Sequence, residues 1–202
     1  QVEGARFNPD TGRWVASAAA VNSGAVRIIP PSDFSGTMNI TIEAVATNAS
    51  LQRATTGATT VPIAVDPGTD GVSIGATPDA GLEEIPGDLN IMLAERDIDG
   101  SEVIGGDVYV RLSDGATLVG GYPVVAIGDA DAAIDGTALV GFYRVPASAV
   151  GGLQIQPASN WHGTVTVEVA AYSTEPVDPS PDADNTQIDV RTFGVTVTPV
   201  AD

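Results

Sequence analysis

The segment "DIDGSE", residues 97–102, gathers three acids, a glycine and a serine in a chain of which only 17% of the residues are charged. In an extended segment alternate side chains point to the same side, so Asp97 and Asp99 would present their carboxylates together. The following glycine allows a turn that would bring Ser101 or Glu102 to the same point. The segment therefore predicts a cup of oxygen ligands; the alternative is a solvated polar turn.

Further acids could join this cup. Glu83 and Glu84 lie about fifteen residues upstream, and Asp66 and Asp70 flank a Pro-Gly linker. If one end of a β-domain collects these segments, their carboxylates repel one another unless a cation binds there. Ca²⁺ is the natural ion, because it takes roughly six to eight oxygens at about 2.3–2.6 Å in flexible geometry and needs no histidine or cysteine.

Other metals fit the composition less well. Mg²⁺ demands near-octahedral geometry and keeps water, and Zn²⁺ wants nitrogen or sulfur ligands, of which the chain has one histidine and no cysteine. The segment is not an EF-hand loop, because its glycine stands at the fourth position and no closing glutamate follows. A second acidic segment, "GDADAAID" with Asp129, Asp131 and Asp135, is either another cation site or a plain loop.

The elements that would position these acids are β-strands. The 202-residue chain is 43% hydrophobic and rich in Val, Ile, Thr, Ala and Gly, a balance that favours short strands joined by tight turns. We expect strands in the second part of the chain near 72–75, 89–95, 106–112, 116–119, 122–127, 139–145, 152–156, 164–171 and 188–198. We expect turns at Asp114-Gly115, Gly120-Gly121, Asp135-Gly136 and Gly151-Gly152, where positive φ angles are tolerated. Strands at this spacing predict an all-β protein with an immunoglobulin-like (cadherin-like) β-sandwich.

Charge excludes some partners. The formal net charge is −18, with no lysine, and most of it belongs to residues 67–202, which carry 21 acids against four arginines. Such a chain repels nucleic acid and anionic membranes. No apolar run reaches the roughly 20 residues of a membrane-spanning helix, so we expect no direct membrane insertion. The start "QVEGARFNPD" lacks the pattern of a signal peptide and indicates an excised piece.

An internal repeat divides the chain. Residues 26–46, "VRIIPPSDFSGTMNITIEAVA", align without a gap with residues 153–173, "LQIQPASNWHGTVTVEVAAYS", at an offset of 127. Phe34 aligns with Trp161, and apolar residues alternate after the shared Gly-Thr pair. The chain thus contains one complete unit, 67–202, preceded by only the second half of another, 1–66. Either strands elsewhere in the parent protein complete that half, or it leans on the second unit.

Several conspicuous residues have plain structural roles to play. Asp33, Asn160 and His162 belong to the turn that precedes the repeated Gly-Thr pair, and we expect a turn function for them. Among the aromatic residues, Trp14 and Trp161 occupy positions where core packing is the simpler interpretation. Tyr122 and Tyr143 are also available to a ligand platform.

These segments resemble a known family. "GLEEIPGDLNIMLAERDIDGSE", "LSDGATL", the turns "PPSDFSGT" and "PASNWHGT" and the ending "PVAD" are similar to the tandem cadherin-like or immunoglobulin-like repeats of giant bacterial repeats-in-toxin (RTX) adhesins, which are exported by type I secretion. The resemblance covers nearly all of 67–202 and, in its second half, 1–66. In such proteins Ca²⁺ at the junctions stiffens a string of modules. By position the implied ligands are Asp70, Glu83 or Glu84, Asp97, Asp99 and Glu102, although Glu84 stands where the family more often has aspartate.

The resemblance implies a monomeric extracellular segment at a bacterial cell surface, whose partners are neighbouring repeats of the same polypeptide. Its function would be that of a calcium-stabilised extender or scaffold that projects ligand-binding domains. The alternatives are a carbohydrate- or peptide-binding module, and a split domain that supports an inserted sugar-binding domain. We do not expect an enzyme, because Asp97 and Asp99, two residues apart, are better placed to share an ion than to bracket a bond, and one histidine leaves no base for a nucleophile beyond His162.

Overall fold

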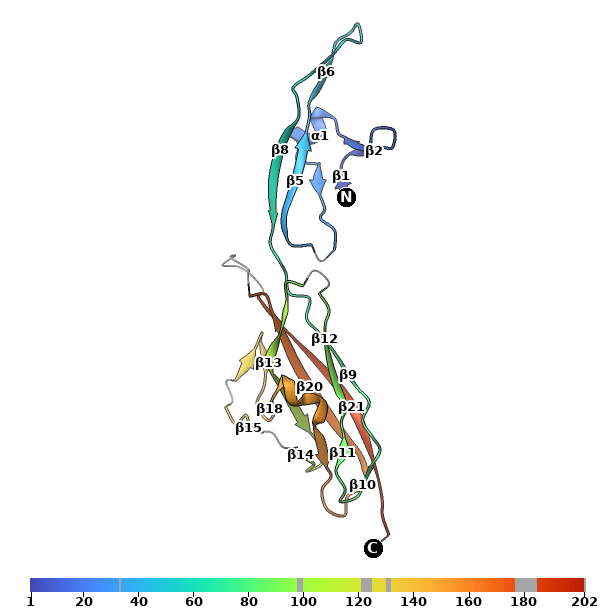
Figure 1. Cartoon of the computed structure of the whole chain (residues 1–202), viewed down its shortest axis with the longest axis vertical. Helices are drawn as coiled ribbons and strands as arrows, with labels where there is room; N and C mark the ends of the chain where they lie inside the picture. Colours follow the sequence, from blue (N-terminus) through green and yellow to red (C-terminus); the bar gives the residue numbers. More distant parts are fainter. Residues whose placement is uncertain (33, 98–99, 121–124, 130–131, 177–184, 202) are drawn as a thin grey trace. The chain divides into compact units, whose positions relative to one another are not determined.

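The structure is a computed structural model, and it describes residues 1–32, 34–97, 100–120, 125–129, 132–176 and 185–201. Its contacts divide the chain into two compact units, Gln1–Pro67 (unit 1) and Gly68–Asp202 (unit 2). This division lies one residue from the boundary that the repeat predicts. The described chain consists mainly of β-strands, so the expected all-β class is confirmed (Figure 1).

Unit 1 contains short strands and one short helix. Its elements are β1 (Val2–Glu3), β2 (Arg6–Asn8), β3 (Arg13–Val15), α1 (Ala18–Asn22), β4 (Arg27–Ile28), β5 (Gly36–Ile42), β6 (Val45–Thr47), β7 (Arg53–Thr55) and β8 (Thr59–Val65). They pair only two by two in the described residues, as β1 with β4, β2 with β3, β5 with β8 and β6 with β7. The helix α1 begins after Ser17, whose side chain accepts a hydrogen bond from the Ala20 N–H at 3.1 Å.

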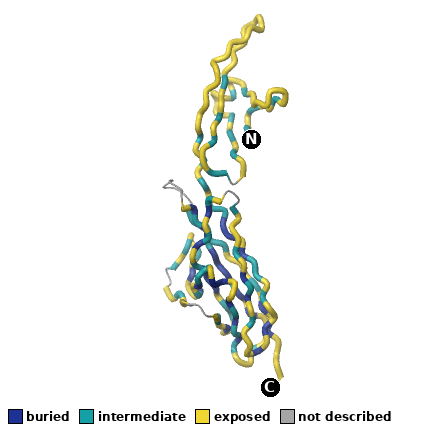
Figure 2. Tube along the Cα trace, in the orientation of Figure 1, coloured by how far each residue is buried: buried dark blue, intermediate teal, exposed yellow. Residues whose placement is uncertain are grey.

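No described residue of unit 1 is buried, as the absence of dark blue from its tube shows (Figure 2). Several large apolar side chains are well exposed, among them Trp14, Ile42 and Val61. A sheet of two strands has no second layer to cover its apolar face, which is why these side chains stay open to solvent.

Unit 2 contains the longer strands. Its elements are β9 (Val72–Ala76), β10 (Gly81–Leu82), β11 (Gly87–Asp88), β12 (Ile91–Glu95), β13 (Val103–Leu112), β14 (Thr117–Val119), β15 (Val125–Ala126), β16 (Ala133–Ile134), β17 (Thr137–Ala138), β18 (Tyr143–Pro146), the 3-10 helix η1 (Ala147–Gly152), β19 (Gln154–Gln156), β20 (Gly163–Thr174) and β21 (Thr186–Thr198).

Unit 2 has a β-sandwich-like core. One sheet has the order β10-β21-β20-β13-β18-β15, and smaller sheets have the orders β11-β19-β14 and β12-β9. The main apolar cluster draws from all three, with Val169 of β20, Ile155 of β19 and Val72 of β9 each fully buried. Every second residue of β20 from Val165 to Ala171 contributes to it, because alternate side chains of a strand share a face.

The longer predicted strands of unit 2 are confirmed, and β20 and β21 extend the predicted ranges by a few residues. The range predicted at 139–145 is a strand only from Tyr143, where β18 begins. The range predicted at 122–127 contains the two-residue β15, and residues 121–124 are outside the described part. The turns at Asp114-Gly115 and Asp135-Gly136 are confirmed by positive φ angles. The prediction at Gly151-Gly152 is wrong, because this pair ends η1. Among the described residues, no helix has the length and apolar character needed to cross a bilayer.

Candidate functional site

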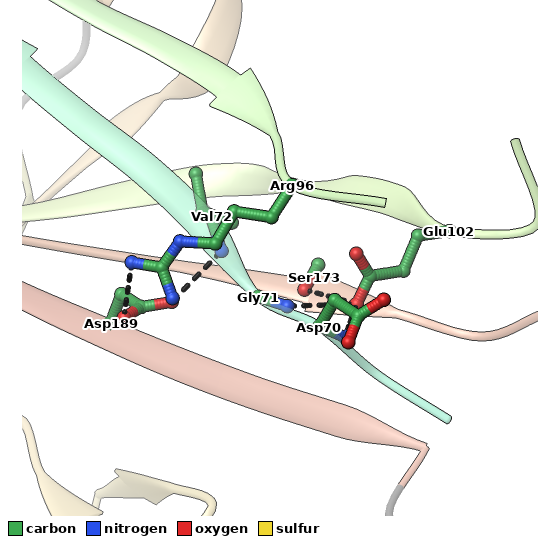
Figure 3. Close-up of polar contacts among 7 residues, drawn as sticks. All are labelled: Asp70, Gly71, Val72, Arg96, Glu102, Ser173 and Asp189. Carbon is green, nitrogen blue, oxygen red and sulfur yellow. Dashed lines mark hydrogen bonds and ion pairs between the residues drawn. The ribbon is translucent and has the colours of Figure 1, made fainter. Parts of the chain in front are cut away.

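Glu102 anchors one end of unit 2. It immediately precedes β13, and its side chain is only 3% exposed. Its Oε1 accepts hydrogen bonds from the backbone N–H groups of Asp70 at 2.6 Å and Gly71 at 3.0 Å, and from Ser173 Oγ at 2.9 Å. Figure 3 shows these donors converging on the carboxylate. A single side chain thus joins the segment before β9, the start of β13 and the end of β20.

A second carboxylate holds the next residue of the same segment. Asp189 of β21 accepts the Val72 N–H at 2.8 Å through Oδ2, and its Oδ1 lies 3.0 Å from Arg96 Nη2 (Figure 3). Glu102 and Asp189 therefore bind three consecutive backbone N–H groups, those of residues 70–72, and we call this arrangement the entry clamp. Each bond is charge-assisted and stronger than one between neutral groups.

Gly71 is required by the entry clamp. Its φ of +89° lies in the region that favours glycine, and a Cβ at this position would overlap the Asp189 carboxylate and the Gln187 side chain. The chain can therefore pass close to β21 only with a glycine here. The clamp fixes the path of the backbone into β9.

Asp97 organises the turn that Gly100 allows in "DIDGSE", while the cup of oxygen ligands there stays a prediction. Asp97 Oδ2 accepts hydrogen bonds from the N–H groups of Gly100 at 2.9 Å, Ser101 at 2.8 Å and Glu102 at 3.3 Å. This is the usual use of an aspartate in a turn, where its carboxylate satisfies the backbone that follows it. Asp99 lies outside the described residues, so its place at the turn stays a prediction.

Glu175 belongs to the same site, and the sequence analysis missed it. Its side chain is 3% exposed, and its Oε1 accepts a hydrogen bond from Ser101 Oγ at 2.8 Å. The pairing of Val103 with Thr174, extended by one residue, puts Glu175 opposite Glu102 across the two strands. A signal was available: the buried alternation of β20, Val169, Ala171 and Ser173, continues in steps of two to Glu175.

The structure brings together Asp70, Asp97, Ser101 and Glu102 but not Glu83 and Glu84. The Glu83 N–H bonds to the Thr198 carbonyl, at the far end of β21 from Glu175, whose N–H bonds to the Asn185 carbonyl. The thirteen residues of β21 span roughly 40 Å at strand spacing. The expectation that both ends of "GLEEIP…DIDGSE" meet was therefore wrong, because this segment runs along the unit rather than folding back on itself.

Glu83 has its own partners at that far end. Its Oε2 accepts the Val200 N–H at 3.0 Å, and its Oε1 lies 3.1 Å from His162 Nδ1. The Val200 hydrogen bond, helped by His162, lowers the pKa of Glu83. Glu84 is exposed and has a φ of +63° in the tight turn that follows β10. His162, from the turn in which it was predicted, thus also contacts Glu83 at hydrogen-bonding distance.

The other predicted ligands are scattered. Asp66 is in unit 1, next to β8. Asp135 is exposed at the turn of the β16–β17 hairpin, and Asp129 is exposed before β16. Asp131 lies outside the described residues. A cation site at the second acidic segment therefore stays a prediction, with a plain loop as its alternative.

Electrostatics single out the pair of buried acids. Glu102 Oε2 is fully buried and receives no hydrogen bond from any described residue. Across the described part of the chain, no three histidine or acidic side chains stand close enough together to hold a metal by themselves. Glu102 and Glu175, with Ser101 and Asp97 beside them, nevertheless supply only hard oxygen atoms. This donor set fits Ca²⁺ better than a metal that prefers nitrogen or sulfur.

The comparisons with known proteins give no family for this chain. The sequence matches no protein-family model, and no curated protein matches it.

Proposed function

We propose that the chain is a calcium-stabilised extender segment of a bacterial surface adhesin, with immunoglobulin-like β-sandwich repeats that act in series outside the cell. The observation that carries the proposal is the pair of buried acids Glu102 and Glu175. Each directly adjoins one member of the Val103–Thr174 pair that joins β13 to β20, and each is only 3% exposed. Like charges at such positions destabilise a sheet unless a cation compensates them.

The position of the pair supports a mechanical role for the ion. Glu102 is also the acceptor of the entry clamp, so its carboxylate links the acid pair to the backbone that leads into β9. A cation at Glu102 Oε2 would leave Oε1 on the N–H groups of Asp70 and Gly71. In this proposal Asp97 shapes the turn, while Ser101 orients Glu175. In the proposal the ion supplies positive charge, while Glu102 and Asp189 fix the path of the backbone that leads into β9.

The negative charge of unit 2 agrees with this role. A surface rich in acids and poor in bases resists association with polyanions and keeps a long string of repeats soluble. In the proposal the partners of the segment are the neighbouring repeats of the same polypeptide. The chain needs no catalytic residue for such a function.

Thermal unfolding tests the proposal. The full chain is melted in EDTA, in millimolar Ca²⁺ and in equal Mg²⁺. A single site at a hundred times its Kd stabilises the folded state by about 2.7 kcal/mol, so the midpoint rises clearly with Ca²⁺ and little with Mg²⁺. Glu175→Gln keeps the shape and the acceptor for Ser101 but removes the charge, and it is expected to lose most of the rise.

A matched control is available on the same strand. Glu168 lies on β20, partly exposed and 2.6 Å from Arg111 Nε, and Glu168→Gln is expected to keep the full calcium response. Small-angle scattering in Ca²⁺ and in EDTA supplies a second readout. Ca²⁺ is expected to narrow the distribution of the radius of gyration of the wild-type chain but not that of Glu175→Gln. Identical melting midpoints with and without Ca²⁺ for the wild-type chain refute the proposal, as does an equal response to Mg²⁺.

A further inference from the structure

Each unit contains an equivalent pair of strands, so unit 2 can serve as a template for unit 1. β5 corresponds to β20 at the repeat offset of 127, so that Gly36 matches Gly163. β8 then corresponds to β21, because Gly36 pairs with Val65 as Gly163 pairs with Val197. A strand or core residue that covers the β20–β21 pair but has no counterpart over the β5–β8 pair is therefore one that unit 1 lacks.

The first difference is at the outer edge of the pair. In unit 2 this edge of β20 is covered by β13, which pairs antiparallel with it, placing Leu112 opposite Val167 and Val110 opposite Val169. In unit 1 the described strands leave the equivalent edge of β5 without a neighbour, since β5 pairs with β8 alone. An open edge next to an apolar face is a site for a further strand.

The second difference is burial on the face of the sheet. Val169 is 0% exposed in unit 2, whereas its counterpart Ile42 is 55% exposed. Val165 is likewise fully buried, while its counterpart Met38 is only partly buried. The alternation of β5 prepares an apolar face of the same kind as that of β20, but no second layer covers it.

The third difference concerns Trp14. The segment "GRWVAS" (residues 12–17) aligns with "GFYRVP" (residues 141–146), so Trp14 corresponds to Tyr143 or to its neighbour Phe142. Tyr143 is half-buried. Phe142 is 3% exposed, clusters with Tyr109 and lies under Arg111, whose Cζ is 4.6 Å from the ring centre. Both covering residues belong to β13. Trp14 itself is 44% exposed and packs against Phe7, with ring centres 5.2 Å apart. The described residues of unit 1 therefore do not give Trp14 the core placement expected for it.

We propose that unit 1 binds a set of strands of the β9–β13 type, donated by a segment that precedes Gln1 in the same polypeptide. The strand equivalent to β13 pairs antiparallel with β5, with its Leu112 position opposite Ile40 and its Val110 position opposite Ile42. The repeat offset places the equivalents of β9–β13 ahead of Gln1, which argues for donation from that side.

A second copy of the chain does not fit as the occupant. Its β13 is already paired on both edges, with β18 and with β20. Its unit 1 offers no strand of this type among the described residues. The proposal concerns a protein surface and needs no cation, so it is tested in EDTA and stands or falls separately from the calcium proposal.

The experiment supplies the donor. A copy of residues 68–127 is fused directly to Gln1 of the full chain, which keeps the spacing of unit 2 to within a few residues, because the offset of 127 places Gln1 at residue 128. The fused copy contains no tryptophan, and Trp161→Phe leaves Trp14 as the only one. We expect Trp14 emission to shift to shorter wavelength, and amide exchange in residues 40–44 to slow by at least about tenfold.

A matched control keeps composition and length. Val110→Pro, introduced only in the fused copy, breaks the ladder of the donor strand and is expected to abolish both changes. If the unmodified fusion leaves Trp14 emission and β5 exchange as they are in the chain without a donor, the proposal is wrong. It is also wrong if the chain without a donor shows these changes as its concentration rises, because a second copy is then the occupant.

A dye measurement on the unfused chain decides the matter even where the fusion does not fold. The open face of β5 should enhance the fluorescence of an apolar dye, and Ile42→Asp should reduce it. Ile85→Asp, at a residue 52% exposed in unit 2, should leave it unchanged. Equal fluorescence of Ile42→Asp and the wild-type chain overturns the proposal.

Discussion

Replacing Glu102 with alanine tests whether the entry clamp holds unit 2 together. The substitution removes the acceptor of three donors, the N–H groups of Asp70 and Gly71 and the hydroxyl of Ser173. Hydrogen bonds to a charged acceptor contribute roughly 1.5–3 kcal/mol each, and a buried donor left without an acceptor costs a similar amount. Part of this loss is offset because the substitution also removes a buried charge, which is costly to keep out of water.

We therefore expect Glu102→Ala to lower the free energy of unfolding of unit 2 by about 3 to 5 kcal/mol in EDTA. For a domain of this size the midpoint then falls by about 10 to 15 °C. Circular dichroism during heating and in urea measures this, and the cooperative transition reports on unit 2 because all buried residues among those described lie there. Faster exchange of the Gly71 amide supplies a local readout.

Glu102→Gln separates hydrogen bonding from charge. Glutamine keeps an acceptor oxygen for the same three donors, so in EDTA its midpoint should stay close to that of the wild-type chain. If Glu102→Ala lies within about 0.5 kcal/mol of the wild-type chain, the clamp does not contribute as its geometry indicates. If glutamine is as harmful as alanine, the three hydrogen bonds are not the cause of the loss.

Two further predictions concern acid stability and packing. The folded-state pKa of Glu83 lies below its ordinary value of 4.5, so as the pH falls the Glu83 carboxylate is protonated in the unfolded chain before it is protonated in the folded one. The stability that Glu83 contributes is therefore lost as the pH falls below about 4.5. Glu83→Gln should flatten this part of a plot of urea midpoint against pH, and the same slope as in the wild-type chain would contradict the prediction. Val169→Ala should lower the free energy of unfolding by about 2 to 3 kcal/mol, because it leaves a cavity in the core. Ile42→Ala, at the corresponding exposed position of unit 1, should change the free energy of unfolding by less than about 0.5 kcal/mol. Equal losses in urea titrations would show that the two positions are not as different as their burial indicates.

Local sequence patterns predicted the strands well. The strands β20 and β21 are long alternating runs, and the turns at Asp114 and Asp135 carry residues that tolerate positive φ, so short-range chemistry suffices to locate them. The two-residue strands β10, β11, β16 and β17 were not predicted, and no strand range was predicted for unit 1. β10 and β11 exist only because β21 and β19 offer them an edge, a contact that no local pattern encodes.

The candidate site was predicted in part. "DIDGSE" has a local signature, and its turn forms around Asp97 as the spacing of the acid and the glycine requires. Glu175 was missed because it lies 73 positions beyond Glu102 and meets it only through the register of β13 with β20. Glu83 was misplaced for the converse reason: nearness in sequence does not keep two acids together when a strand carries the chain from one end of the unit to the other.

By itself, the sequence determined the all-β class, the acidic turn and the longer strands of unit 2, because each follows from residue types a few positions apart. It also determined the repeat that relates the two units, through the direct alignment of residues 26–46 with 153–173. Only the tertiary structure decided which acids share an end of unit 2, which of them are buried, and which apolar face of unit 1 stays open. These depend on how strands distant in the chain pair and pack. Burial and charge pairing are properties of that packing, since a carboxylate is costly only where neighbours exclude water from it.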